Sequence, residues 1–242
     1  MRRRAILGVL AAGAALAVLP PVIRRLRAPD LTYHPLPGLP GFRKLSGGDV
    51  SSGDPLLIGL DGGAVTALPE DICAGLFDDD TPADHVPIAY FSDARCIYCR
   101  ILSPILHEIA DSAPVRITWH ELPLLGPTSR RAAQASVAAR NQGAYRTFHD
   151  RLMGTPFVPN DAYLRRIAAD AGIDADQLLR DMASDAVADS LARTARIARA
   201  FGFYGTPALV VGRTAILGSL DKRRLRRLIE AERISADPQP CT

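Results

Sequence analysis

Two cysteines spaced two residues apart, in the motif Cys96-Ile97-Tyr98-Cys99, are the residues whose chemistry is easiest to identify. Disulfide exchange uses this spacing, and so do zinc sites and structural disulfides, so the motif alone leaves these alternatives open. The pair stands where an apolar stretch changes to a helical pattern, which puts both sulfurs in a first helical turn. Unpaired N–H groups and the positive end of the helix dipole stabilise a thiolate there, so we predict a lowered pKa for Cys96. Arg95 adds to this effect if it points inward, but a solvent-facing Arg95 fits the sequence equally well.

The positions of the two sulfurs also suggest an order of reaction. A lowered thiol pKa favours the reduced form of the pair, so it makes the disulfide more oxidising. Cys96 opens the helix and is expected to react first. Cys99, one turn further in, is expected to be shielded and to act second.

The apolar pattern on either side of the motif predicts the elements that position it. A buried strand is expected at residues 86–91, a helix at 95–111 and a second strand at 115–122. A block that is nearly all helix follows, at residues 128–142, 145–153, 161–171, 174–182 and 187–201. Two strands, 208–211 and 214–217, then flank a Gly212-Arg213 turn, and Asp221 caps a last helix to about residue 234.

Three further features accompany the cysteine motif. Phe91 ends the preceding strand, Pro104 lies five residues after Cys99, and Gly205-Thr206-Pro207 stands directly before the predicted hairpin. With these features and the helical block between them, residues 82–234 resemble the DsbA-like thiol:disulfide oxidoreductases of the thioredoxin superfamily. The resemblance implies an α/β thioredoxin fold with a helical insertion between its βαβ half and its C-terminal β-hairpin and helix.

The same resemblance implies a role for the second motif. In the family, the proline that matches Pro207 forms a cis peptide bond and faces the cysteine pair. The backbone of Thr206 is then free to pair with a substrate chain as a strand does, and its side chain lies near the sulfurs. We therefore expect Thr206 and Pro207 to bind substrate, with an ordinary proline at a strand start as the alternative.

The chain departs from the family pattern at two places. Ile97-Tyr98 replaces the Pro-His pair found between the cysteines of the strong oxidants, so a histidine that stabilises the thiolate is missing. Tyr90, six residues before Cys96, occupies the strand position where many relatives carry a buried acid that shuttles a proton. These departures leave the redox potential, and hence the direction of the reaction, open.

The amino terminus has the pattern of an export signal. Three arginines precede residues 5–23, which carry no charge, and Arg3-Arg4-Ala5-Ile6-Leu7 resembles a twin-arginine signal. We interpret residues 1–29 as a signal peptide or an N-terminal membrane anchor, with a buried helix of the domain as the alternative. A Pro/Gly-rich arm with a short strand at 56–60 is expected at 30–81. The thioredoxin domain is expected at 82–235, with its helical insertion at about 127–203 and a tail at 236–242.

Composition and charge exclude several other classes of protein. Hydrophobic residues make up 48% of the 242 residues, enough for a buried core. The net charge is +3, but without residues 1–29 it becomes 23 − 26 = −3, so the sequence does not indicate nucleic-acid binding. The five histidines do not stand at ligand spacing from the cysteine pair, so neither a metal nor another cofactor is expected. Among them, His149 is interpreted as a partly buried helix residue.

Cys73 and Cys241 lie outside the motif. Leftover cysteines often pair in an oxidising compartment, so we predict a structural disulfide that ties the arm to the tail. Two separate thiols, one buried and one in the tail, are the alternative.

The sequence therefore predicts an exported thiol:disulfide oxidoreductase, periplasmic or otherwise extracytoplasmic, which exchanges a Cys96–Cys99 disulfide with the thiols of substrate proteins, mainly to oxidise them. A membrane-tethered reductase or isomerase is the nearest alternative, and a non-catalytic chaperone or metal-delivery module is another. The resemblance implies a DsbB-like membrane protein as redox partner. The arm lacks heptads, so we expect a monomer.

Overall fold

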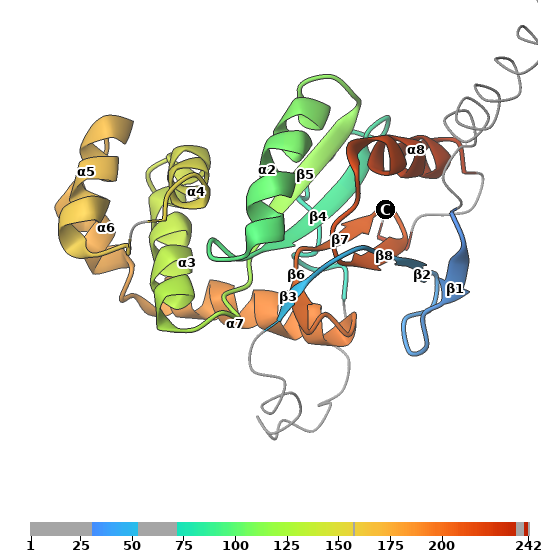
Figure 1. Cartoon of the computed structure of the whole chain (residues 1–242), viewed down its shortest axis with the longest axis horizontal. Coiled ribbons are helices and arrows are strands. Elements are labelled where there is room, and N and C mark those ends of the chain that lie inside the picture. Colours follow the sequence, from blue (N-terminus) through green and yellow to red (C-terminus); the bar gives the residue numbers. More distant parts are fainter. Residues whose placement is uncertain (1–30, 53–71, 157, 236–239, 242) are drawn as a thin grey trace, which may run out of the picture. The chain divides into compact units, whose positions relative to one another are not determined.

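The computed structural model describes residues 31–52, 72–156, 158–235 and 240–241 (Figure 1). Contacts divide the chain into Met1–Leu31 and Thr32–Thr242, and the fold described below is that of the second unit. The predicted leader at 1–29 and the expected strand at 56–60 lie outside the described residues. In the described part of the chain, no helix combines the length and apolarity that crossing a bilayer requires.

A mixed sheet in the order β1-β2-β8-β7-β4-β5 forms the centre of this unit. Its strands are β1 (Tyr33–Pro35), β2 (Arg43–Ser46), β4 (Val86–Ser92), β5 (Val115–Glu121), β7 (Ala208–Val211) and β8 (Thr214–Leu217). β4 pairs with β5 in parallel and with β7 in antiparallel, and β7 pairs with β8 in antiparallel. Gly212 opens the β7–β8 turn with a φ of 54°, a conformation that costs glycine little and explains the residue chosen there.

In the described part of the chain, seven helices accompany the sheet, and they confirm the predicted α/β thioredoxin fold with a helical insertion. They are α2 (Ile97–Ala110), α3 (Pro127–Arg140), α4 (Tyr145–Met153), α5 (Asp161–Ala171), α6 (Ala175–Asp181), α7 (Asp185–Ala200) and α8 (Lys222–Arg233). α2 and α8 lie on one face of the sheet and α7 on the other, while α3 to α6 gather beside it (Figure 1). The insertion has its own core, built around Phe148, Leu164 and Leu178.

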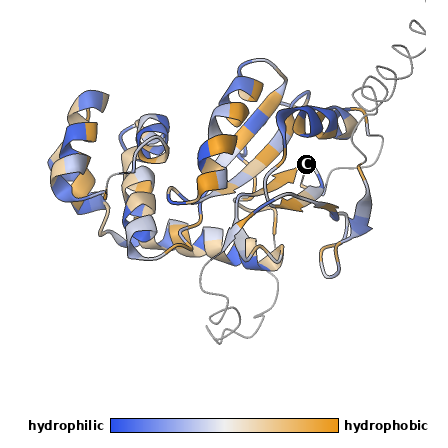
Figure 2. Ribbon diagram, viewed as in Figure 1, coloured by the Kyte–Doolittle hydropathy of each residue, from blue (hydrophilic) through white to orange (hydrophobic). Residues whose placement is uncertain are grey.

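Every residue of β4 is buried, because both faces of this central strand are covered. Ala89 and Phe91 pack in one cluster with Ile197 of α7. Tyr90, which points to the opposite face, reaches Ser103 of α2. Figure 2 shows hydrophobic residues along these central strands, whereas α8 displays mainly hydrophilic residues.

The described part of the arm contains strands that the sequence analysis did not predict. The strand expected at 56–60 lies outside the described residues, and the described part of the arm contains β1, β2 and a third strand, β3 (Ser51–Ser52). β2 adds to the sheet parallel to β8, with Leu45 opposite Ile216 and fully buried. These strands have two to four residues each, and β2 and β3 pair with partners far along the chain, so local periodicity gives no sign of them.

One buried ion pair fixes the arm to the domain. The Arg43 guanidinium lies 2.8 Å from the Glu232 carboxylate of α8 and donates a second hydrogen bond, also 2.8 Å, to Thr214 of β8. The Glu232 side chain is completely buried. A buried carboxylate is costly without a partner of opposite charge, so the end of α8 is stable only when Arg43 at the start of β2 is in place.

Candidate active site

Cys96 and Cys99 lie at the N-terminus of α2, as the spacing of the motif predicts. Cys96 is the N-cap residue, and its sulfur accepts a hydrogen bond of 3.2 Å from the backbone N–H of Cys99. Pro104 lies inside the helix. Both cysteines are free thiols, and both are fully buried.

The loop before β7 supplies the other side of the site. The peptide bond between Thr206 and Pro207 is cis, and the Cys96 thiol donates to the Thr206 carbonyl oxygen across 3.2 Å. The structure thus brings together four residues that the sequence analysis named, from segments more than one hundred residues apart. They are Cys96, Cys99, Thr206 and Pro207.

The two thiols have very different acidities. The pKa of Cys96 falls from 9.0 to about 6, chiefly because the Cys99 thiol donates a hydrogen bond to the Cys96 sulfur. Burial opposes this fall, and a hydrogen bond from the Ser51 side chain adds to it. The pKa of Cys99 is strongly raised, first by burial and then by Cys96. One sulfur is therefore poised as a thiolate near neutral pH while the other holds its proton.

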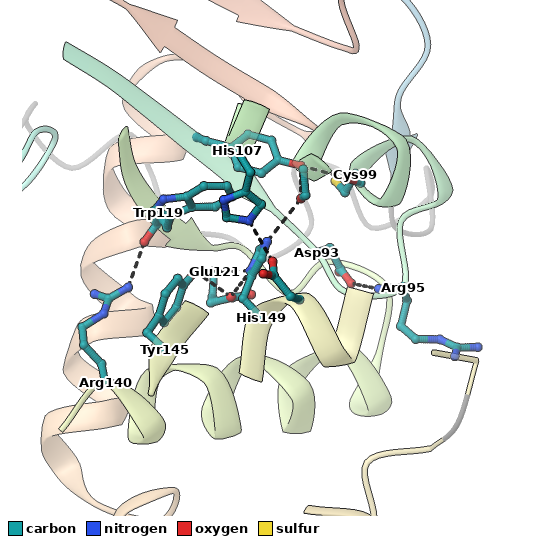
Figure 3. A network of polar contacts seen from close by, with 12 residues as sticks. Asp93, Arg95, Cys99, His107, Trp119, Glu121, Arg140, Tyr145 and His149 are labelled. Atoms are coloured by element: carbon teal, nitrogen blue, oxygen red, sulfur yellow. Dashed lines mark hydrogen bonds and ion pairs between the residues drawn. The ribbon is translucent and has the colours of Figure 1, made fainter. Parts of the chain in front are cut away.

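Asp93, which the sequence analysis did not single out, fixes the loop that leads into α2. Its buried carboxylate accepts hydrogen bonds from the backbone N–H groups of Arg95 (2.8 Å), Leu124 (2.8 Å) and Leu125 (3.0 Å). Burial raises the pKa of this carboxyl group. Because β4 and β5 end side by side, one carboxylate can hold the loops that follow both strands. The Arg95 side chain is exposed and donates to the Pro156 carbonyl oxygen, so it points away from the sulfurs (Figure 3).

The arm covers the cis-proline loop. Ser51 and Ser52 of β3 pair in antiparallel with Thr206 and Gly205 of β6 (Gly205–Thr206). The segment before β3 crosses the end of β8, where Gly48 donates to the Ser219 carbonyl oxygen at 2.8 Å. A Cβ atom on Gly48 would stand 2.8 Å from that same oxygen, so the close approach requires glycine. The backbone edge that the resemblance assigns to substrate is thus paired with the chain's own arm.

A line of buried polar groups begins at Cys99 and ends at His149 and Glu121 (Figure 3). The Tyr90 hydroxyl donates to the Cys99 carbonyl oxygen (3.3 Å) and contacts the Ser103 hydroxyl (3.2 Å). Ser103 contacts His149 Nε2 at 3.2 Å, and His149 Nδ1 lies 3.0 Å from Glu121 Oε1. Burial raises the pKa of Tyr90 well above 10, and Cys99 raises it further.

His149 differs from its predicted state. We interpreted it as a partly buried helix residue, but it is 1% exposed and its ring nitrogens both have partners. Its partner Glu121 lies at the end of β5 and is 3% exposed. Helical periodicity shows which face of α4 is buried but not which strand residue meets it, so this pair was missed.

The two remaining cysteines lie away from the site. Cys73 and Cys241 form a disulfide that joins the end of the arm to the C-terminal tail across 168 residues of sequence. Among the residues that the structure describes, no group of three or more His, Cys, Asp or Glu side chains has the arrangement of a metal site. A cavity of about 530 Å³ lies between α7, β5 and the segment 75–80, and its lining includes neither Cys96 nor Cys99.

Comparisons with known proteins agree with this geometry. A family model described as the DSBA-like thioredoxin domain matches residues 87–230. A thioredoxin-like oxidoreductase from Silicibacter pomeroyi is 35% identical, with a TM-score of 0.62 over 67% of this chain and 98% of that one. A periplasmic thioredoxin-like protein from Salmonella enterica serovar Typhimurium is 23% identical, with a TM-score of 0.61 over 69% and 98% of the two chains, and shares the fold.

A curated relative is much longer. The Na(+)/H(+) antiporter NhaA 3 of Salinispora tropica is 31% identical over 129 residues, which are 52% of this chain but 20% of that protein. The chain thus spans about a fifth of the length of this relative. Since the family model covers more than half of the chain, the protein belongs to the DsbA-like family of thioredoxin-fold thiol:disulfide oxidoreductases.

Proposed function

We propose that the protein exchanges a Cys96–Cys99 disulfide with the thiols of other proteins, and that it works mainly as an oxidant. The observation that carries this proposal is the setting of Cys96. Its sulfur caps α2, has a pKa of about 6 and lies 3.2 Å from the carbonyl oxygen next to a cis-proline. A stabilised thiolate favours the reduced pair, and this makes the disulfide a better oxidant.

The reaction begins with the oxidised enzyme. A substrate thiolate attacks the Cys96 sulfur, the Cys96–Cys99 bond breaks, and Cys99 leaves as a thiolate that takes up a proton. A second substrate thiolate then attacks the substrate sulfur of the mixed disulfide and releases Cys96 as its stabilised thiolate. Two substrate thiols become one disulfide, and the enzyme disulfide becomes two thiols. In the reductive direction Cys96 attacks first and Cys99 resolves the mixed disulfide.

The substrate is an extended polypeptide that presents a cysteine. Its backbone pairs with Thr206, whose carbonyl oxygen lies beside the Cys96 sulfur, and Pro207 keeps the backbone in this position. Since β3 pairs with the same edge, substrate binding displaces at least Ser51 and Ser52.

The proposed compartment is extracytoplasmic. The charge pattern of residues 1–29 supports export, with residues 5–23 as signal or tether, and the disulfide between Cys73 and Cys241 suits an oxidising compartment. A similar protein is described as periplasmic. The enzyme acts as a monomer and is reoxidised by a DsbB-like membrane protein.

Trapping tests the exchange reaction. Cys99→Ala removes the resolving thiol, so its Cys96 thiolate should attack a disulfide of an unfolded, oxidised client, release one client thiolate and accumulate as a mixed disulfide on non-reducing gels. Cys96→Ala is the matched control and should trap none. Equal trapping by both variants, or by neither, would refute exchange through Cys96. Equilibration with glutathione then gives the direction, since a potential near that of thioredoxin, about −270 mV, would mean reduction and one near that of DsbA, about −120 mV, oxidation.

A further inference from the structure

The resolving thiol has no direct route to water. Cys99 is fully buried, and burial is the main reason that its pKa is raised. When Cys99 attacks a mixed disulfide at Cys96, it must first lose its proton inside the protein. When it leaves as a thiolate in the opposite direction, it must gain a proton there. A group that holds this proton must therefore be connected to Cys99 through the interior.

Asp93 is the buried carboxylate nearest in sequence, but its oxygens are occupied. It accepts three backbone N–H groups, and protonation would weaken these hydrogen bonds, which fix the loops after β4 and β5. The line of side chains shown in Figure 3 leads instead to His149. Each contact in it, from Tyr90 to Ser103, from Ser103 to His149 and from His149 to Glu121, is 3.0 to 3.2 Å long.

The ends of this line have complementary chemistry. The Glu121 carboxylate accepts the Tyr145 hydroxyl at 2.8 Å, and since a carboxylate only accepts, the hydrogen between it and His149 sits on Nδ1. Nε2 is then the basic nitrogen, and it faces the Ser103 hydroxyl. At the other end, the Tyr90 hydroxyl lies at Cys99, where it donates to the backbone carbonyl oxygen at 3.3 Å and where the Cys99 thiol raises its pKa. Two hydroxyl groups, each able to accept and to donate, thus stand between a thiol and a base.

We propose that Tyr90 and Ser103 relay the Cys99 proton to Nε2 of His149, which Glu121 orients. The inference rests on the proposed exchange reaction and concerns its resolving step. The Cys99 proton passes to Tyr90 as Tyr90 passes its own to Ser103 and Ser103 passes its own to His149. The Cys99 thiolate attacks the Cys96 sulfur, the Cys96–Cys99 bond forms, and the substrate sulfur leaves with its electron pair. In the oxidising direction the proton returns along the same path to the departing Cys99 thiolate.

Other groups that face His149 do not join this line. The indole of Trp119 packs on the His149 ring with 4.9 Å between centroids. His107 of α2 lies 6.5 Å away, ring to ring, and its Nε2 is engaged by Asp150 at 2.7 Å. Arg140 stacks over the Tyr145 ring, and burial lowers the pKa of His107. His107 is therefore a matched control, because it is a neighbouring histidine on α2 that contacts the same indole.

A single-turnover experiment on the full reduced chain separates the two thiols. An excess of an aryl disulfide that releases a coloured thiolate gives two phases. Cys96 attacks first, in a phase whose rate depends on reagent concentration, and Cys99 resolves the adduct in a phase that does not. We expect Tyr90→Phe and Ser103→Ala to slow the second phase by about 10- to 100-fold and to leave the first unchanged. We expect His107→Gln to change neither.

The pH dependence distinguishes a relay from a packing role. Without the relay, hydroxide must remove the Cys99 proton, so the rate of the second phase of Tyr90→Phe should rise about tenfold per pH unit. The rate of the wild-type second phase should depend less steeply on pH. A second phase as fast as in the wild type in both variants would overturn the relay, and so would an equal slowing of both phases. If the wild-type chain shows no first phase, the exchange reaction itself fails and the relay with it.

Discussion

The hydrogen bond from Cys99 to Cys96 is the interaction on which the acidity of the active-site sulfur most depends. It is the largest cause of the fall in the Cys96 pKa from 9.0 to about 6. That fall corresponds to about 4 kcal/mol at ~1.36 kcal/mol per pKa unit. A hydrogen bond to a charged group contributes about 1.5–3 kcal/mol, so its loss in Cys99→Ala should raise the Cys96 pKa by about one to two units.

The ultraviolet absorbance of the thiolate, followed against pH, measures this change directly. Cys99→Ser is the matched control, because its hydroxyl can donate from nearly the same place and should keep the midpoint close to that of the wild type. The backbone N–H of residue 99, 3.2 Å from the Cys96 sulfur, is present in all three proteins. If Cys99→Ala keeps the wild-type midpoint, the helix terminus and Ser51 stabilise the thiolate without help from the second thiol, and the reasoning is wrong.

Four more predictions follow from the same contacts. Because the pKa of Cys96 is lowered, its contribution to the stability of the reduced protein is complete above pH 9 and disappears as the pH falls through about 6. In urea, the free energy of unfolding of the wild type minus that of Cys96→Ala should therefore be about 1.4 kcal/mol larger at pH 7 than at pH 5. The same difference at both pH values would contradict this. Cys73→Ala opens a loop of 168 residues and should lower the free energy of unfolding in urea by up to about 5 kcal/mol, so an unchanged value would contradict a stabilising role of the disulfide. Arg43→Met leaves Glu232 buried without its cation and should cost about 3–5 kcal/mol in the same measurement, so a cost under about 1 kcal/mol would mean that the pair is not buried in solution. Ser51→Pro breaks β3 and should expose Cys96 to large reagents. The ratio of its alkylation rate with a bulky maleimide to its rate with the small reagent iodoacetamide should rise about tenfold over the wild type. An unchanged ratio would show that β3 does not cover the sulfur.

Local patterns in the sequence were sufficient for most of the helices and for the position of the cysteine pair. α4 and α5 have the predicted bounds, 145–153 and 161–171. α5 begins after Asn160, whose side chain accepts the Tyr163 N–H, and ends at Gly172 with a φ of 70°. These signals involve residues at most four apart, so they can be recognised without a fold.

The resemblance to the family added long-range information that local patterns lack. It connected the segment before the hairpin with the cysteine motif and implied the cis bond at Pro207. No periodicity relates these two segments, because they meet only when β4 and β7 pair at the centre of the sheet.

Only the tertiary structure decided the surroundings of the two sulfurs. β3 lies on the cis-proline loop because β2 has joined β8, and the pairing partners are about 150 to 170 residues apart in the sequence. His149 meets Glu121 because α4 of the insertion packs near the end of β5, and neither residue carries a local signal of the other. A short strand or a single buried ion pair is stable only within a formed core, which supplies the low dielectric and the fixed partners. The sequence therefore determined which thiols could react. The packing of distant segments decided the pKa values of these thiols, the strand that covers them and the side chains that can exchange protons with them.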